Sequence, residues 1–298
     1  MNGRRKLKTS LIAYLFLSPA LIIAVAFVFY PSVFVLKLSF MDWDLIKPVQ
    51  EFVGWGNFER LFAPGTEFWP AFWHTIQYGV IYMPLTIVLG LLIALALMRI
   101  EFLQGFFQTI YFFPAITSIS VIAIVWSYIY NPQMGLLNSF LRTVGIPVTA
   151  LPQWLNDPDL AMIALALMGV WQSLGFVVLL FVAGLRNIPT TFYDAAMVDG
   201  ANQRTIFWKI TLPLLSPVLF FVVFMLLINS FNVFGVVAIM TKGRPLGSTN
   251  VLLYFIYEQA FQLFDAGLAS AASVTVFLII LLFVFMQMKF GEKLVFYQ

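Results

Sequence analysis

Two asparagines lie deep in an otherwise apolar stretch of the chain. Asn229 and Asn232 are three residues apart, so a helix would place both carboxamides on one side. Polar groups within an apolar membrane segment usually face the interior of a helix bundle or a wet cavity. A carboxamide both donates and accepts hydrogen bonds, which suits sugar hydroxyls. We expect the pair to line a substrate pathway; the alternative is a hydrogen-bonded bridge between packed helices.

A second candidate group lies in a different apolar segment. Trp171, Gln172, Ser173 and Phe176 combine aromatic faces with an amide and a hydroxyl. An aromatic face with a few placed hydrogen-bonding groups is what a sugar site requires. Ordinary helix packing explains Gln172, Ser173 and Phe176 equally well, and space filling is the alternative for Trp171.

The composition indicates a membrane protein. The 298 residues are 62% hydrophobic and 10% charged, whereas soluble domains are about 25% charged. The absence of cysteine excludes disulfides, thiolate metal sites and cysteine nucleophiles. The single histidine, His74, cannot build a multi-histidine metal site. The net charge of +3 does not indicate nucleic-acid binding, because the charges lie in short segments between apolar runs.

Six apolar segments are long enough to cross a bilayer, for which a helix needs about 20 residues. They cover residues 11–36, 73–98, 106–129, 160–184, 214–240 and 268–288. We therefore predict an all-α polytopic membrane protein with six transmembrane helices in a single domain, 1–298. The first segment follows Arg4, Arg5, Lys6 and Lys8, but it is too long for a signal peptide and no small-residue cleavage site follows it. We expect it to be retained as a span.

The basic residues predict the orientation. With a cytoplasmic N-terminus, ten of the 16 lysines and arginines lie inside, but only four of the 13 acidic residues. Short loops rich in lysine and arginine face the cytoplasm. Both termini and the segment 185–213 are therefore expected in the cytoplasm, and the segment 241–267 outside.

The segment 185–213 is polar and helix-prone. Thr191 is expected to cap a first helix, which Asp199 and Gly200 end, since glycine accepts a left-handed turn. A second helix is expected over 201–209. The candidate contact residues on this helix, turn, helix element are Asp194, Ala195, Ala196, Asp199, Gly200, Ala201, Phe207, Ile210, Leu212 and Pro213. The alternative is an ordinary amphipathic loop that lies on lipid headgroups.

This segment resembles the EAA loop of permease subunits of bacterial ABC importers. The loop reads E-A-A, three residues, G, nine residues, I-x-L-P, and only Asp194 departs from it, where Glu is usual. Further stretches are similar to the carbohydrate branch, the maltose and glycerol-phosphate type. They include 17–20, 52–58, 131–138 and 183–189, and also 241–245, where Arg244 replaces a glycine. The resemblance implies the type I importer permease fold, with the candidate residues of the two spans lining a sugar site.

The resemblance also implies partners. These are a second related permease, two copies of an ABC ATPase that dock on the loop, and an extracytoplasmic solute-binding protein. The chain has no G-x-x-x-x-G-K-[ST] motif, so ATP and Mg²⁺ are expected on the ATPase and no cofactor on this chain. The expected location is the bacterial cytoplasmic membrane, and the expected cargo is a sugar, oligosaccharide, polyol or glycoside. The rival is an ion- or proton-coupled carrier, which usually needs buried ionisable groups; the predicted spans hold almost none.

Overall fold

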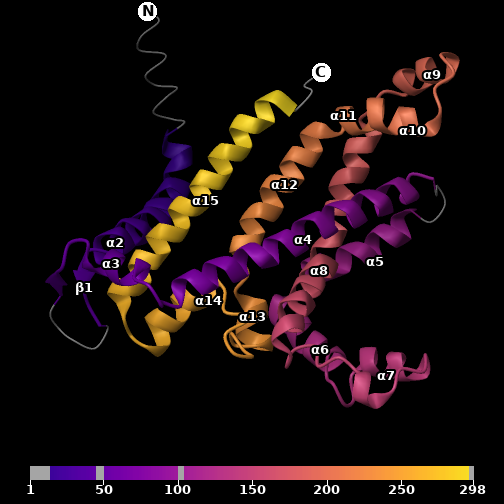
Figure 1. Ribbon diagram of the computed structural model, residues 1–298. Coiled ribbons are helices and arrows are strands. Elements are labelled where there is room, and N and C mark those ends of the chain that lie inside the picture. The colour runs from indigo at the N-terminus through magenta and orange to yellow at the C-terminus, as the bar shows by residue number, and fades with distance from the viewer. Residues whose placement is uncertain (1–13, 45–49, 100–103, 295–298) are drawn as a thin grey trace, which may run out of the picture. The chain divides into compact units, whose positions relative to one another are not determined.

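The computed structural model describes residues 14–44, 50–99 and 104–294, and these are mostly helical (Figure 1). Five helices are long and apolar enough to cross a membrane, and a sixth crossing is formed if one bent helix pair counts as a span. The five are Tyr14–Leu38, Phe68–Leu97, Pro158–Arg186, Ser216–Met240 and Ala266–Gly291. They match five of the six predicted segments. Residues 11–13 of the first segment, and Arg4, Arg5, Lys6 and Lys8, lie outside the described residues.

The internal contacts of the chain divide it into two compact units, 1–66 with 256–277, and 67–255 with 278–298. The first unit holds the helix Tyr14–Leu38, a two-stranded antiparallel sheet, a short helix and the beginning of α15. Its elements are η1 (Val25–Phe29), α2 (Tyr30–Leu38), β1 (Met41–Asp42), β2 (Glu51–Phe52), α3 (Gly56–Phe62), η4 (Glu258–Gln262) and α15 (Ala266–Leu294).

Polar contacts hold this first unit together. Asn57 of α3 is buried, and its Nδ2 donates hydrogen bonds to the carbonyl oxygens of Ser39 at 3.1 Å and Met41 at 2.8 Å. Arg60 forms an ion pair with Asp265, just before α15. Segments about 200 residues apart in the chain are thereby joined.

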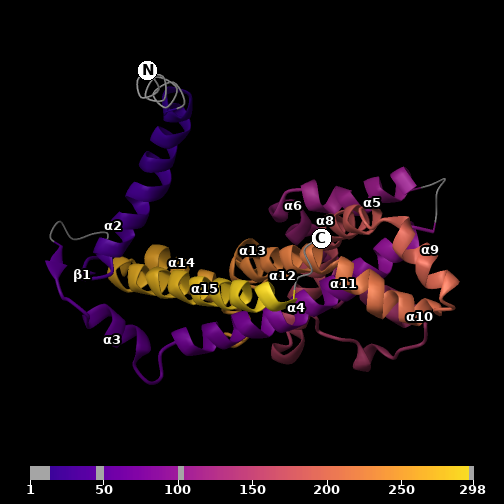
Figure 2. The same cartoon turned by 90° about the horizontal axis from the view of Figure 1, so that it is seen from above.

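The second unit contains most of the helices, and α14 (Leu252–Tyr257) is shared by the two units. Figure 2 shows α8 of this unit beside α4 and α12, and these helices pack on one another. The elements are α4 (Phe68–Leu97), α5 (Gln104–Ile116), α6 (Ile119–Ile129), α7 (Leu136–Thr143), η2 (Val148–Ala150), α8 (Pro158–Arg186), α9 (Thr190–Val198), α10 (Gln203–Ile206), η3 (Phe207–Thr211), α11 (Leu212–Leu214), α12 (Ser216–Phe231) and α13 (Gly235–Met240).

Helix α8 packs against its neighbours through glycines. A Cβ atom at Gly175 would overlap the main chain of Tyr111 in α5. At Gly184 a Cβ atom would lie 2.7 Å from Cγ2 of Val218 in α12. Small residues of this kind let membrane helices approach closely, where packing rather than the hydrophobic effect drives their association. The spacing of α5 and α12 around α8 therefore depends on these two positions.

The structure divides the predicted span 106–129 into two helices. α5 ends at Ile116, α6 begins at Ile119, and the two helices are bent by 107°. Pro114 removes a helical N–H donor, and Thr117 Oγ1 bonds the carbonyl oxygen of Phe113 at 2.8 Å. Such back-bonding competes with the helical ladder. Ser118 then takes an extended conformation (φ −55°, ψ 131°), which separates the two helices.

The predicted span 214–240 is also interrupted. α12 ends at Phe231, Asn232 is its C-cap, and α13 begins only at Gly235. Asn232 therefore lies just beyond a helix end, not within the same helix as Asn229. Polar groups on non-helical backbone at membrane depth are tolerated where they are buried in protein or line a wet cavity.

We predict that Gly175→Ala destabilises the protein by about 1–3 kcal/mol, the usual cost of overpacking. The added methyl group would meet main-chain atoms of α5, which cannot rotate away as a side chain can. Thermal unfolding of the purified protein measures the effect. Gly56→Ala is the matched control, because its Cβ would meet Val53 at an ordinary 3.6 Å. Equal melting temperatures for the two variants would contradict the close approach of α5 and α8.

Candidate functional site

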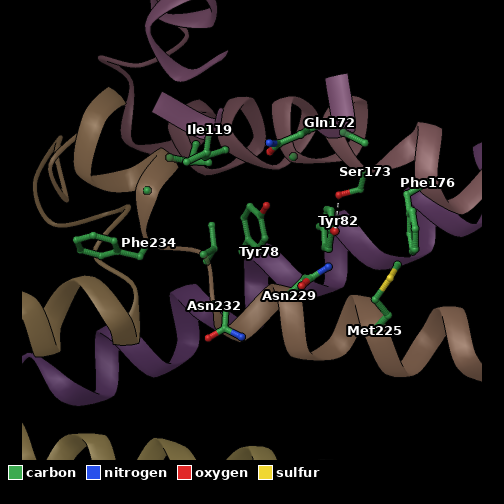
Figure 3. A pocket seen from close by; sticks show the side chains of 15 residues that line it. Tyr78, Tyr82, Ile119, Gln172, Ser173, Phe176, Met225, Asn229, Asn232 and Phe234 are labelled. Carbon is green, nitrogen blue, oxygen red and sulfur yellow. Dashed lines mark hydrogen bonds between the residues drawn. The ribbon is translucent and has the colours of Figure 1, made fainter. Parts of the chain in front are cut away.

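The second unit contains a cavity of about 370 Å³, which we call the central cavity (Figure 3). Its walls come from α4, α8, the break between α5 and α6, and the break between α12 and α13. The lining residues are Tyr78, Tyr82, Ala115, Ile119, Gly169, Gln172, Ser173, Phe176, Met225, Asn229, Asn232, Val233, Phe234, Gly235 and Val236. Residues at or beside each of the two helix breaks therefore line the same cavity.

Uncharged hydrogen-bonding groups lie around this cavity. The Tyr82 hydroxyl is 2.7 Å from Ser173 Oγ, and Asn229 lies close to the same tyrosine (Figure 3). The rings of Tyr78 and Tyr82 are stacked, with centroids 5.3 Å apart and an interplanar angle of 21°. Within the described part of the chain the Asn232 carboxamide has no hydrogen-bond partner. None of the lining residues that the structure describes is Asp, Glu, Lys, Arg or His.

The lack of a side chain at Gly169 leaves room for the two stacked tyrosines. A Cβ atom on Gly169 would overlap the Tyr78 hydroxyl and approach Tyr82 Cδ2 to 3.5 Å. The absence of a side chain on this turn of α8 therefore allows the Tyr78 phenol to lie against the helix. An aromatic platform with hydroxyl and amide groups beside it can stack on a sugar ring and bond its hydroxyls.

The structure brings five of the six residues selected from the sequence around the central cavity: Gln172, Ser173, Phe176, Asn229 and Asn232. Trp171 is not among the lining residues. Its ring packs instead against Trp126, with centroids 5.5 Å apart, in an edge-to-face arrangement. The helix turns by about 100° per residue, so Trp171 points away from the cavity that its neighbour Gln172 lines.

Sequence reasoning missed Tyr78 and Tyr82. A signal was present, because the two residues are four apart in an apolar segment and so share a helix face. Their hydroxyls are polar groups at membrane depth, as are the two asparagine amides. Their significance depends on Gly169 and Ser173, which belong to a different helix and are brought beside them only by the fold.

The segment between α8 and α12 contains α9, a turn, α10, η3 and α11. Gly200 has a φ of +75°, the left-handed conformation that favours glycine. The predicted Thr191 cap is wrong: α9 begins at Thr190 after Pro189, and no side chain caps it. The second helix begins two residues later than expected, because Asn202 Oδ1 accepts a hydrogen bond from the Thr205 N–H at 2.9 Å. We call residues 190–214 the coupling loop, after the role that we propose for them.

The candidate contact residues of the coupling loop divide by exposure. Asp194, Ala195, Asp199 and Gly200 are exposed. Ala201, Phe207, Ile210, Leu212 and Pro213 are partly buried. Ala196 is buried within the fold. A Cβ atom on Gly200 would meet no atom within 4 Å, so the surface at the turn is open.

Comparisons with known proteins agree with this arrangement. Residues 86–294 match the family model "Binding-protein-dependent transport system inner membrane component". The chain is 32% identical to the sn-glycerol-3-phosphate transport system permease protein UgpA of Agrobacterium fabrum, covering 96% of this chain and 97% of that one. It is also 32% identical to the trehalose/maltose transport system permease protein MalF of Thermococcus litoralis, covering 98% and 97%.

The fold is also found in a solved structure. One chain of a bacterial ABC transporter involved in the import of the acidic polysaccharide alginate superposes with a TM-score of 0.82 at 21% identity, covering 98% of this chain and 99% of that one. None of these comparisons supports the alternative of an ion- or proton-coupled carrier. The chain belongs to the family of inner membrane components of binding-protein-dependent transport systems and is a non-catalytic permease subunit of an ABC importer.

Proposed function

We propose that this permease passes a neutral sugar, oligosaccharide, polyol or glycoside through its central cavity. The observation that carries the proposal is the chemistry of the lining, which offers amides, hydroxyls and stacked phenol rings and, among the described residues, no Asp, Glu, Lys, Arg or His. A phosphate or a uronate would need a compensating cation when it leaves water. Neutral hydroxyls need only hydrogen-bonding partners of both kinds, which carboxamides supply.

The free carboxamide of Asn232 favours substrate binding over helix bridging. A bridging amide would be bonded to a neighbouring helix, but within the described residues this carboxamide has no such partner and it lines the cavity. Asn229 differs, because it lies near Tyr82 and can orient that hydroxyl. We assign Asn232 to direct contact with the cargo and Asn229 to contact and positioning together.

The proposed assembly contains a second related permease, two ABC ATPase subunits that bind ATP and Mg²⁺, and an extracytoplasmic solute-binding protein. Support for the binding protein comes from the alginate transporter, which has been solved in complex with a substrate-bound periplasmic protein. Support for a second permease comes from the helix Tyr14–Leu38, whose apolar window has no buried residue in this chain alone. Bilayer lipid and a neighbouring subunit together would cover it.

The coupling loop is proposed to dock on the ATPase from the cytoplasm. It joins α8, which carries Gln172 and Ser173, to α12, which carries Asn229. Movement of the loop would therefore act on two helices that line the cavity. We place the whole chain, as one permease domain, in the bacterial cytoplasmic membrane with both termini inside.

Reporter fusions test this topology. Reporters after Gln298 and within 190–210 are expected to be cytoplasmic, and a reporter within 241–266 is expected to be external, following the lysine and arginine asymmetry. An external reporter at 190–210 would contradict both the orientation and the docking of an ATPase on the coupling loop.

Gly200→Val is expected to uncouple the transporter. A β-branched side chain resists the left-handed turn that Gly200 adopts at φ +75°, and it adds bulk to an open surface. We predict normal assembly in the membrane but loss of ATP hydrolysis stimulated by the binding protein.

Asp194→Glu is the control for the coupling loop, because it keeps the charge on the same exposed face of α9 and should be tolerated. Normal stimulated hydrolysis and uptake in Gly200→Val would show that the loop is a surface element with no part in coupling.

Asn232→Ala is expected to weaken uptake at low substrate concentration by several-fold to about tenfold, since it removes one or two hydrogen bonds worth about 0.5–1.5 kcal/mol each. Melting temperature and stimulated ATP hydrolysis should stay near the wild-type values, because the amide has no partner among the residues that the structure describes.

The matched control for Asn232→Ala removes an asparagine side chain at a position outside the central cavity. Asn156→Ala acts at an exposed position outside the central cavity, and its substrate dependence should be unchanged. If Asn232→Ala lowered the melting temperature and left the substrate dependence intact, the asparagine would be a structural bridge and the cavity would lose its main polar contact.

A further inference from the structure

A second, larger cavity lies under the coupling loop. It has a volume of about 790 Å³ and is bounded by the ends of α4 and α8, by α9, and by the stretch from α10 to η3. We call it the basic cavity, because three of its lining residues are Arg99, Arg186 and Arg204. None of the described residues that line it is Asp or Glu. It is separate from the central cavity, with which it shares none of its described lining residues.

Two of the three arginines of this cavity are uncompensated within the described part of the chain. Arg99 and Arg204 have no ion-pair or hydrogen-bond partner there for their guanidinium groups, and both side chains are exposed. Helix α9 begins at Thr190 on the same cavity with no side-chain cap, so free N–H groups add to the positive potential. The hydroxyls of Tyr193 and Thr211 are 3.3 Å apart and bond each other, which leaves one further donor. Together these groups suit a phosphate.

The walls between the arginines are apolar. Leu95, Met98, Leu185, Ile188, Ile206 and Phe207 line the basic cavity. A free phosphate ion has no apolar part that could cover these walls, whereas the glycerol and upper acyl chains of a lipid would cover them. The volume is also far larger than a single phosphate requires. The ligand chemistry is therefore that of a phosphate attached to an apolar body.

The position of the arginines matches the headgroup level of a bilayer. Arg186 is the last residue of α8, a helix of 29 residues, and Arg99 follows the C-cap of α4, a helix of 30 residues. Basic side chains at the ends of spans extend to the interface. Basic pockets between transmembrane helices on the cytoplasmic side bind anionic lipid headgroups.

We propose that the basic cavity binds one anionic phospholipid of the inner leaflet, with its phosphate on Arg99 and Arg204 and its apolar part against α4 and α8. The proposal rests on the cytoplasmic orientation given above. Because Tyr193 and Arg204 belong to the coupling loop, the lipid would brace the loop against the ends of two spans. Anionic lipid would then do more than surround the spans, because efficient coupling would require it.

The test uses the whole transporter, purified with the subunits that accompany this chain, in nanodiscs of phosphatidylcholine with and without phosphatidylglycerol. Native mass spectrometry counts the lipid that stays bound after detergent extraction. We expect phosphatidylglycerol to be retained in preference to phosphatidylcholine. Arg99→Gln and Arg204→Gln should each lower that retention about fivefold, as expected for one basic residue at a membrane surface.

Lys209→Gln is the matched control, because Lys209 is an exposed basic residue of the same loop that does not line the basic cavity. It should retain phosphatidylglycerol like the wild type. Equal retention of the two lipids, or unchanged retention in the arginine variants, would overturn the proposal. Displacement of the lipid by inorganic phosphate alone would show that the site takes a free anion. Loss of the ATPase subunit from the arginine variants, with retention unchanged, would assign the cavity to that subunit.

This test does not depend on the cargo. Asn232→Ala should alter uptake and leave phosphatidylglycerol retention unchanged, whereas the arginine variants should alter retention and the lipid dependence of stimulated ATP hydrolysis. A failure of the sugar proposal would appear only in uptake, and a failure of the lipid proposal only in retention.

Discussion

Close approach of helices to α8 is the constraint on which the second unit depends. Gly175 lets α5 pass main chain to main chain, and Gly184 admits Val218 of α12. Gly169 makes the space that the Tyr78 hydroxyl occupies. In a bilayer, helix association gains little from apolar burial, so tight packing of this kind supplies much of the drive. The same three glycines therefore fix the helix positions and, with them, the walls of the central cavity.

The central cavity lies where regular helix is interrupted. Ala115 and Ile119, which flank the break at Thr117–Ser118, line its wall, as do residues 232–234 in the break between Phe231 and Gly235. Breaks leave main-chain polar groups that a membrane tolerates only beside protein or water. Polar side chains collect at the same depth for the same reason. The coupling loop then connects α8 and α12, so movement of this loop would act on two helices that line the cavity, as our proposal for coupling requires.

Much of the fold was predictable from local sequence patterns. Runs of apolar residues identified five spanning helices, and the spacing around Gly200 located a left-handed turn. The positions of the helix breaks do not follow from the apolar pattern, because that pattern continues through Thr117 and through Asn232. Whether a polar residue there ends a helix depends on its neighbours in three dimensions. Tyr78 and Tyr82 were missed for a related reason, since the groups that give them a role lie on α8.

Site-directed cysteine labelling tests the central claim directly, because the chain has no cysteine of its own. A cysteine at position 232 should react with a water-soluble maleimide, and the rate should fall when the binding protein delivers its sugar in the presence of ATP. A cysteine at position 171, outside the cavity lining, should show no such protection. Equal rates at position 232 with and without cargo would contradict the account, since the central cavity would then not be the compartment that holds the sugar.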